Sequence, residues 1–162
     1  MQSGNHMRRF LWLLSLILGI ALADQLVKRW MVELIGPSAS QHRIELLGSF
    51  VALEYLQNTG AAFGMFRDAT TLFAIVAVVA IGVGLFLVWR EAASDWPLAF
   101  GISFIIGGAL GNVIDRIVRG YVVDFVAIGR FWKFNLADSC ITLGVLFVFW
   151  LLWRADNQES DT

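Results

Sequence analysis

Four long apolar stretches dominate the chain and decide what it can fold into. They cover residues 10–30, 72–89, 96–114 and 137–153, and each has roughly the 17–25 residues that a helix needs to cross a bilayer. Hydrophobic residues make up 58% of the 162 residues and charged residues 15%, against about 45–50% and 25% in soluble domains. We therefore predict one integral-membrane domain, residues 1–162, that is mainly α-helical with four transmembrane helices.

The number of spans sets the topology but not the orientation. An even number places both chain ends on one side of the membrane and both loops, 31–71 and 115–136, on the other. More Lys and Arg residues lie on the loop side, which favours cytoplasmic loops. Arg8 and Arg9 precede the first span, which favours cytoplasmic ends. Both orientations remain open at this point.

The start of the chain has two interpretations. Residues 1–6 lack a hydrophobic pattern and resemble a sequence added for expression, so Met7 is the expected native start. The run from Phe10 to Ala23 ends in small residues, as a cleavable secretory signal does. A membrane span is the preferred interpretation, because about 20 residues are needed to cross the bilayer and this places Asp24 inside the span.

The first loop contains a strand-like pattern. Between Arg43 and Asn58, apolar residues recur at near-alternating positions on either side of Gly48 and Ser49. This pattern predicts two short strands joined by a turn, and hence a small β-sheet in the first extramembrane loop. The apolar side of such a sheet would either rest on lipid or receive an extended peptide by strand addition.

Short polar clusters occur where the apolar segments end, all on the loop side of the membrane. They contain Asp24 with Lys28, Asn58, the run from Gly107 to Arg116, Asp124, and Asn135 with Asp138. Carboxylates at the edge of a bilayer are costly to keep, so their convergence predicts a functional site.

Two of these clusters also have structural interpretations. Asp24 and Lys28 are four positions apart on one helix face, so they are either an ion pair or part of a catalytic site. Gly107, Gly108 and Gly111 lie in an apolar helix with no preceding strand. This context favours close helix packing over a phosphate-binding loop.

The asparagines of these clusters also have both structural and functional interpretations. Asn58 is either an ordinary turn residue or the donor of an amide that holds a substrate carbonyl. Asn135 and Asp138, three positions apart at the start of the fourth span, have the spacing of a helix N-cap pair. Asn112 and Asp115 repeat that spacing at the end of a predicted helix, where N-capping has no use.

Two further charged residues flank these pairs. Arg116 follows Asp115 directly, which suggests a local ion pair, although Arg116 is also suited to a substrate carbonyl or a lipid phosphate. Asp124 lies among valine and phenylalanine, with no basic residue within four positions. A carboxyl group in such surroundings is hard to ionise.

The residue inventory limits the chemistry. One cysteine, Cys140, and two histidines provide no multi-cysteine or zinc ligand set, so we expect no metal and no other cofactor. No basic stripe suggests nucleic acid. Two aspartates that share one proton are then the most economical active site, and the segment 127–133 between them has the length of a lid.

Three other classes remain open on this reasoning. A proton- or ion-coupled transporter also keeps charged residues within its spans, but usually near mid-bilayer on broken helices. A serine-lysine protease would use Ser139 with Lys133 or Lys28. A structural membrane assembly factor needs no reactive group at all.

Five sequence blocks together resemble, in order, the signature blocks of bacterial lipoprotein signal peptidase (signal peptidase II, LspA family). They are Asp24-x-x-x-Lys28, Asn58-x-Gly60-Ala61-Ala62-Phe63, Gly107-Gly108-Ala109-x-Gly111-Asn112-x-x-Asp115-Arg116, Val122-Val123-Asp124-Phe125 and Phe134-Asn135-x-Ala137-Asp138. The blocks run from the first span to the fourth. One block alone would be weak evidence, whereas the ordered set is highly specific.

The resemblance implies a specific activity and location. The family removes signal peptides from prolipoproteins just before a cysteine that carries diacylglycerol. It works in the bacterial inner (cytoplasmic) membrane, with both termini cytoplasmic and the active site toward the periplasmic or outer face. By position in the blocks, Asp124 and Asp138 are the catalytic pair. The positions that support this pair or contact peptide and lipid are Asp24, Lys28, Asn58, Gly108, Asn112, Arg116, Asn135 and Ala137.

The resemblance also implies the partners. These are diacylated prolipoprotein signal peptides, membrane phospholipid, and cyclic peptide inhibitors of the globomycin type, whose hydroxyl-bearing residue sits between the two aspartates. We expect a monomer with no nucleic-acid partner.

Overall fold

Four helices and four strands make up the described part of the chain. The computed structural model describes residues 2–60 and 70–160. In chain order the elements are α1 (Gln2–Ile35), β1 (Arg43–Leu47), β2 (Val51–Asn58), α2 (Thr70–Ser94), α3 (Trp96–Arg119), β3 (Val122–Ile128), β4 (Trp132–Phe134) and α4 (Leu136–Ser160). All four helices are long and apolar enough to cross a membrane, which confirms the four predicted spans.

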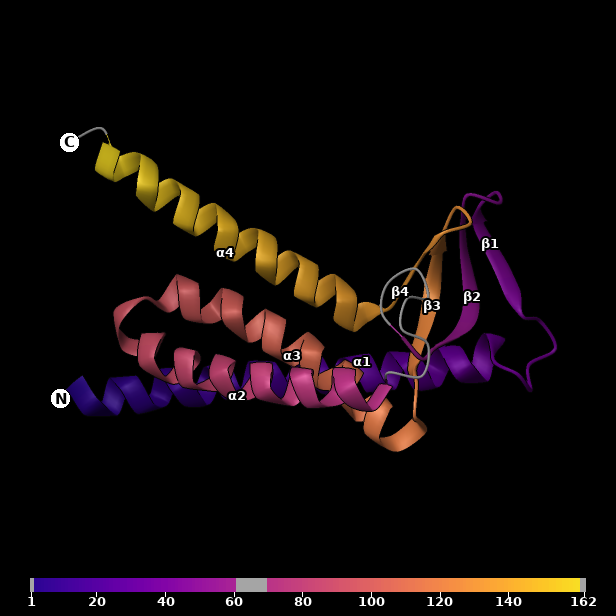
Figure 1. Cartoon of the computed structure of the whole chain (residues 1–162), viewed down its shortest axis with the longest axis horizontal. Coiled ribbons are helices and arrows are strands. Elements are labelled where there is room, and N and C mark those ends of the chain that lie inside the picture. Colours follow the sequence, from indigo (N-terminus) through magenta and orange to yellow (C-terminus); the bar gives the residue numbers. More distant parts are fainter. Residues whose placement is uncertain (1, 61–69, 161–162) are drawn as a thin grey trace.

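The helices form an open bundle with both chain ends at one end. Figure 1 shows α1, α2 and α3 side by side, while α4 diverges from them toward the C-terminus. Before it diverges, α4 packs along α3 as far as Val148, which lies against Gly101. Asp95 forms the tight turn between α2 and α3, because its side chain accepts a hydrogen bond from the Leu98 N–H and so caps α3. Each helix extends beyond the predicted span, as expected where a helix continues into the interface.

Glycines let α3 approach its neighbours. A Cβ atom at Gly107 would come within 2.8 Å of the Ile20 side chain on α1. One at Gly108 would overlap the Ala137 carbonyl oxygen on α4, and one at Gly111 would lie 2.5 Å from the Asp24 carboxylate. The close-packing interpretation of these glycines is therefore confirmed, and α3 is the central helix that α1 and α4 both contact.

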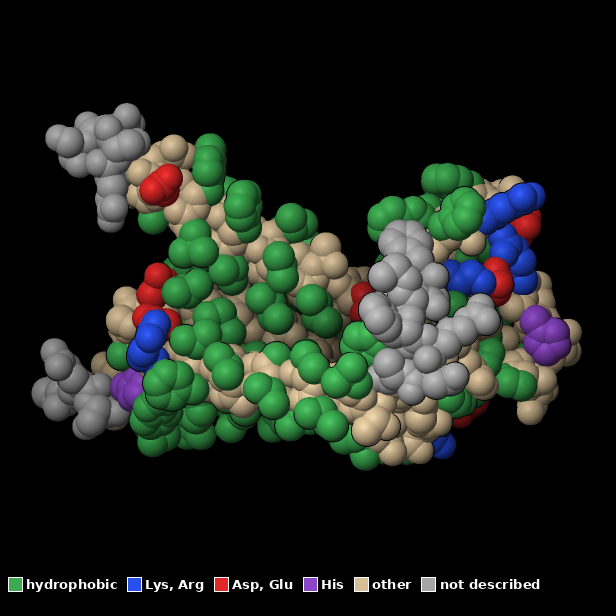
Figure 2. Space-filling model, viewed as in Figure 1, with side chains coloured by type: hydrophobic (Ala, Val, Ile, Leu, Met, Phe, Trp, Pro, Cys, Tyr) green, Lys and Arg blue, Asp and Glu red, His purple; other side chains and the backbone are tan. Residues whose placement is uncertain are grey.

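The outer surfaces of the helices are apolar. Figure 2 shows hydrophobic side chains along the length of the bundle, with charged side chains gathered near its two ends. In α2 only 11% of the most apolar window is buried inside the protein, although that window has a mean hydropathy of 2.8. Such a surface belongs in lipid, since helices that expose it to water would aggregate.

An antiparallel sheet stands at the end of the bundle opposite the termini (Figure 1). Its strand order is β1-β2-β3-β4. The predicted small sheet is confirmed, with β1 and β2 meeting at a turn in which Gly48 has a φ of 54°. The sheet is larger than expected, because β3 and β4 from the second loop extend it.

The second loop was harder to predict than the first. Residues Val122 to Val126 form an almost continuous apolar run, and β3 is buried along most of its length. A strand covered on both faces has no polar alternation to reveal it. The predicted lid, residues 127–133, is a β-hairpin that turns at Gly129, whose N–H donates to the Phe50 carbonyl at 2.7 Å.

The third helix ends later than the sequence suggested. We predicted its span to stop at residue 114, but α3 continues to Arg119 and ends at Gly120, which adopts a left-handed φ of 77°. The placement of Asn112 at a helix end was therefore wrong. The last turns of α3 carry Asn112 and Asp115 beneath the sheet, where both are buried.

Candidate active site

A buried lysine anchors the polar end of the bundle. Lys28 on α1 is 0% exposed. Its Nζ lies 2.8 Å from Asp24 Oδ2, 2.8 Å from Asp115 Oδ2 and 2.9 Å from Asn112 Oδ1. An ammonium group has three donors, so all three are used. The Asp24–Lys28 ion pair, one of the two interpretations of this cluster, is confirmed. The contacts of Lys28 with Asp115 and Asn112 tie α1 to α3.

Asp115 forms ion pairs with Lys28 and Arg119 and not with Arg116, which the sequence suggested. Besides Lys28, it accepts hydrogen bonds from Arg119, from Gln25 Nε2 at 3.1 Å and from the Val123 N–H at 3.1 Å. The predicted pair with Arg116 was wrong. Adjacent residues on a helix point about 100° apart, whereas residues four apart share a face.

Asn112 links this charged cluster to the predicted catalytic residues. Its Oδ1 accepts from Lys28 and from Asn135 Nδ2, the latter at 3.1 Å. Its Nδ2 donates to Asp138 Oδ1 at 2.8 Å. Because both ends of the amide are engaged, Asn112 has one defined orientation and fixes that of Asp138.

The start of α4 is a reciprocal N-cap, as the spacing predicted. The Asp138 N–H donates to Asn135 Oδ1 at 3.0 Å, and the Asn135 N–H donates to Asp138 Oδ2 at 3.1 Å. This is a capping box with an aspartate at the third helical position. Ala137, between them, donates its N–H to Asp24 Oδ1 at 3.0 Å and so joins the cap to the buried ion cluster.

Asp124 lies in the middle of the sheet and is held by two amides. Its side chain on β3 is 1% exposed. Oδ1 accepts from Asn135 Nδ2 at 2.9 Å, and Oδ2 accepts from Asn58 Nδ2 at 2.9 Å. Burial and the nearby negative charge of Asp138 raise the pKa of Asp124 to about 6, although both amide hydrogen bonds oppose the rise. The predicted resistance of this carboxyl to ionisation is confirmed.

Asn58 is the turn residue that the sequence suggested, and its side-chain amide is directed at Asp124. Its Oδ1 accepts the Gly60 N–H at 3.1 Å, as in an ordinary Asx turn. Its amide nitrogen donates to Asp124. The rest of this sequence block, Ala61 to Phe63, lies outside the described residues.

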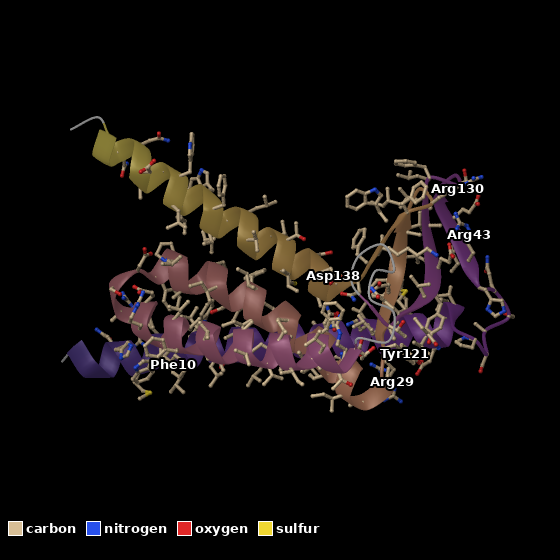
Figure 3. All side chains as sticks on the ribbon, viewed as in Figure 1. Phe10, Arg29, Arg43, Tyr121, Arg130 and Asp138 are labelled. Atoms are coloured by element: carbon tan, nitrogen blue, oxygen red, sulfur yellow. The ribbon has the colours of Figure 1, made fainter. Side chains whose placement is uncertain are left out.

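A cavity of about 690 Å³ opens beside Asp138 and Asn58. Among the described residues, Asp124 is not part of its wall but is hydrogen-bonded to Asn58, which is. Figure 3 places Asp138 at the start of α4, where the helix meets the sheet. The wall is formed by β2, α3, the β3–β4 hairpin and α4, through Asn58, Gly60, Arg116, Trp132, Lys133, Phe134, Asp138, Ser139, Thr142 and Leu143. The hairpin that replaces the predicted lid therefore borders the cavity through β4.

Arg116 contributes a cation to this wall. Its guanidinium lies 5.8 Å from the centre of the Phe73 ring, and Nη1 donates to the Asn112 carbonyl at 3.4 Å. Among residues 2–60 and 70–160, it makes no ion pair within 4.0 Å. Its side chain lines the cavity, where it could donate to a ligand.

The serine-lysine alternative has no support from these contacts. Ser139 donates to the Asn135 carbonyl at 3.1 Å. Lys133 donates to Glu54 at 2.6 Å, and Lys28 is saturated by its three acceptors. Within the described residues, neither lysine is hydrogen-bonded to Ser139.

All ten residues that the sequence singled out lie in this region of the structure, and two others join them unexpectedly. Gln25 donates to the Gly111 carbonyl and to Asp115, and Arg119 donates to Gln25 Oε1 at 3.2 Å. The position of Arg119 four residues after Asp115 was the signal that would have found it. Gln25 carried no such signal, since its contacts with Gly111 and Asp115 lie on another helix.

A signal peptidase II family model, "Signal peptidase (SPase) II", matches residues 16–154, which is most of the chain. The chain belongs to the signal peptidase II family. The lipoprotein signal peptidase of Streptococcus thermophilus (strain CNRZ 1066) is 38% identical over 143 residues, covering 87% of this chain and 92% of that protein. The lipoprotein signal peptidase of Symbiobacterium thermophilum is 39% identical over 146 residues, covering 85% and 92%.

Solved structures of bacterial membrane enzymes share the fold of this chain. A bacterial membrane enzyme solved by the in meso method at 2.3 Å resolution is 26% identical and superposes with a TM-score of 0.78, covering 90% of each chain. A second one, at 1.9 Å resolution, is 28% identical with a TM-score of 0.73, covering 86% of this chain and 91% of that one. As a member of the signal peptidase II family, the chain is a multi-pass bacterial membrane peptidase.

Proposed function

We propose that this chain is an aspartic endopeptidase of the membrane, with Asp124 and Asp138 as its catalytic pair. Its substrate is a diacylglyceryl-modified prolipoprotein, cleaved just before the lipidated cysteine. The substrate class is inferred from the names of the relatives and from the five sequence blocks.

One observation carries the catalytic assignment. Asn135 donates its side-chain N–H to Asp124 Oδ1 at 2.9 Å and its backbone N–H to Asp138 Oδ2 at 3.1 Å. One buried residue therefore holds both carboxyl groups, although they come from different elements. Two carboxyls brought together by a common donor cannot both ionise readily, which is the condition for sharing a proton.

The reaction follows from that shared proton. The ionised carboxylate takes a proton from water while the water oxygen attacks the scissile carbonyl carbon. The protonated carboxyl stabilises the resulting oxyanion by donating to it. The amide nitrogen then receives a proton from the pair, the C–N bond breaks, and the two new ends are a carboxylic acid and an amine. Asn58, Asn112 and Asn135 keep the pair aligned throughout.

The place of the site suits a lipid-anchored substrate. Asp138 lies where α4 meets the sheet, at the end of the membrane-spanning helices (Figure 3). Asp124 is joined to it through Asn135. A substrate held by an acyl anchor moves sideways within the bilayer, so its scissile bond lies at interfacial depth. Arg116 lines the cavity and would donate hydrogen bonds to a substrate carbonyl or a lipid phosphate.

The remaining expectations belong to the same proposal. The chain would lie in the inner membrane as a monomer, with cytoplasmic termini and the aspartates toward the periplasmic or outer face. A globomycin-type cyclic peptide would place its hydroxyl between Asp124 and Asp138. A transporter fits less well, because the four described spans are unbroken helices and the buried charges gather at one end.

The test is cleavage of a diacylated prolipoprotein by purified protein. Asp124→Asn and Asp138→Asn each remove a carboxyl but keep its size, so each should lower turnover by more than 100-fold, as losses of general acid–base groups do. Asp95→Asn changes an exposed carboxyl at the other end of the bundle and serves as the matched control. Ser139→Ala should also remain active. Near-native turnover by either catalytic variant would refute the proposal.

A further inference from the structure

A second cavity lies at the end of the bundle away from the aspartates. It has a volume of about 550 Å³ and is lined by Arg8, Arg9, Leu11, Trp12, Ser15 and Trp96. The start of α1 lies beside the turn between α2 and α3 (Figure 1). Arg9 Nη1 donates to the Ala93 carbonyl at the end of α2, at 3.4 Å. Nothing in the proposed cleavage reaction uses this cavity.

The cavity has a cation held on an aromatic wall. The Arg9 guanidinium carbon lies 5.9 Å from the centre of the Trp96 ring, and the Trp12 ring centre lies 5.4 Å from that of Trp96. This cation–π contact holds the guanidinium beside the ring without neutralising its charge. Arg8 lines the same cavity from the adjacent position.

Nearby carboxylates do not neutralise these arginines. In the described part of the chain, neither Arg8 nor Arg9 has a carboxylate within 4.0 Å. The acidic residues of the neighbouring turn have other partners. Glu91 pairs with Arg90 at 2.6 Å, and Asp95 caps α3 through the Leu98 N–H. The cavity is therefore positively charged.

The position of the cavity selects a lipid as its ligand. Tryptophans of membrane proteins gather at the level of the lipid headgroups. The two tryptophans of this cavity, Trp12 and Trp96, belong to the transmembrane helices α1 and α3. Basic pockets between such helices bind anionic headgroups. Guanidinium groups match phosphate oxygens geometrically, while the trimethylammonium of a zwitterionic lipid would be repelled by two arginines.

We propose that Arg8, Arg9, Trp12 and Trp96 form a binding site for the headgroup of an anionic glycerophospholipid in the leaflet on the side of the chain termini. The phosphate would lie between the two guanidinium groups, and the glycerol and upper acyl chains would lie along Leu11 and the indoles. The site is separate from the aspartates and does not depend on the proposed function.

The test is native mass spectrometry of the purified full chain in detergent, with dioleoylphosphatidylglycerol or dioleoylphosphatidylcholine added at equal molar ratio. The native chain should retain the anionic lipid preferentially. The attraction typical of two basic residues at an anionic surface predicts that Arg8→Gln/Arg9→Gln weakens this binding roughly 30-fold. Arg8→Lys/Arg9→Lys keeps the charge and should retain most of the binding, which also tests whether any loss reflects misfolding.

Arg154 supplies a matched control. Its guanidinium lies 5.8 Å from the Trp150 ring on α4, so it is also an arginine stacked on a tryptophan of a transmembrane helix. It does not line the cavity. Arg154→Gln should therefore bind the anionic lipid as the native chain does. Equal retention of the two lipids by the native chain, native binding by the double glutamine variant, or an equal loss in Arg154→Gln would each overturn the proposal.

Discussion

Replacement of Lys28 by methionine tests whether the buried ion cluster holds the bundle together. Methionine keeps the length and the apolar stem of the side chain but removes its charge. Asp24 and Asp115, both 0% exposed, would then lose the cation that lies 2.8 Å from each of them. Asp115 would keep Arg119, whereas Asp24 would keep two neutral donors, the Ala137 N–H at 3.0 Å and Gln25 Nε2 at 3.3 Å.

The expected loss of stability is large. Removal of one partner from a buried ion pair costs about 3–5 kcal/mol, because an uncompensated charge stays buried. For a domain of about 150–250 residues, each kcal/mol shifts Tm by about 2–4 °C. Lys28→Met should therefore lower Tm by roughly 6–20 °C.

Arg29→Met is the matched control, since it removes the next cation along the same helix. The Arg29 side chain is 77% exposed, and its partner Glu33 is 66% exposed. Exposed pairs contribute about 0–1 kcal/mol, so Tm should fall by less than about 4 °C.

A second measurement isolates the charge. Adding Asp24→Asn to Lys28→Met removes the carboxylate that was left uncompensated, so the double variant should lose less stability than the two single variants summed. Thermal unfolding of the purified proteins in detergent, followed by circular dichroism, measures all four variants. Equal small shifts for Lys28→Met and Arg29→Met, or full additivity in the double variant, would refute this account of the cluster.

Three further predictions concern the packing, the cap and the titration of the site. Gly111→Ala should lower stability by about 1–3 kcal/mol, because its Cβ would lie 2.5 Å from a buried carboxylate oxygen. Gly82→Ala is the control and should not lower stability, because a Cβ there would have nothing within 4 Å. Equal melting temperatures for the two variants would contradict the packing argument. Asn135→Ala and Asp95→Ala should each cost about 0.5–2 kcal/mol as lost N-caps, but only the former should abolish cleavage of a diacylated prolipoprotein. Because the pKa of Asp124 is raised from 3.8 to about 6, the folded chain holds a proton that the unfolded chain releases between these pH values. Stability, measured as Tm, should therefore fall as pH rises from about 4 to about 6. Asp124→Asn should flatten this slope of Tm against pH, and an unchanged slope would count against the raised pKa.

Local sequence patterns were enough to predict many of the contacts in the candidate active site. The Asn135–Asp138 cap and the Asp24–Lys28 pair each join residues three or four positions apart, so helical geometry alone predicts them. The resistance of Asp124 to ionisation was visible in its apolar neighbours. Where helical phase was neglected, as for Arg116 beside Asp115, the prediction failed.

Contacts between distant segments could not be predicted in this way. The pairing of β2 with β3 brings Leu56 opposite Asp124, and so places Asn58 near that carboxyl. Nothing local in Val122 to Ile128 distinguishes a strand buried on both faces from the end of a buried helix. The role of Gln25 likewise depends on how α1 crosses α3.

The sequence by itself determined that this protein resides in a lipid bilayer and that it has four transmembrane helices. It also determined at which end of the bundle the polar residues gather. These properties follow from hydropathy and from distances of a few residues, which are fixed by helical geometry. The tertiary structure decided that Asn135 holds both aspartates and that Lys28 has three acceptors. Such arrangements depend on helices and strands meeting in three dimensions, because a buried donor is satisfied by whichever acceptor the packing brings to it.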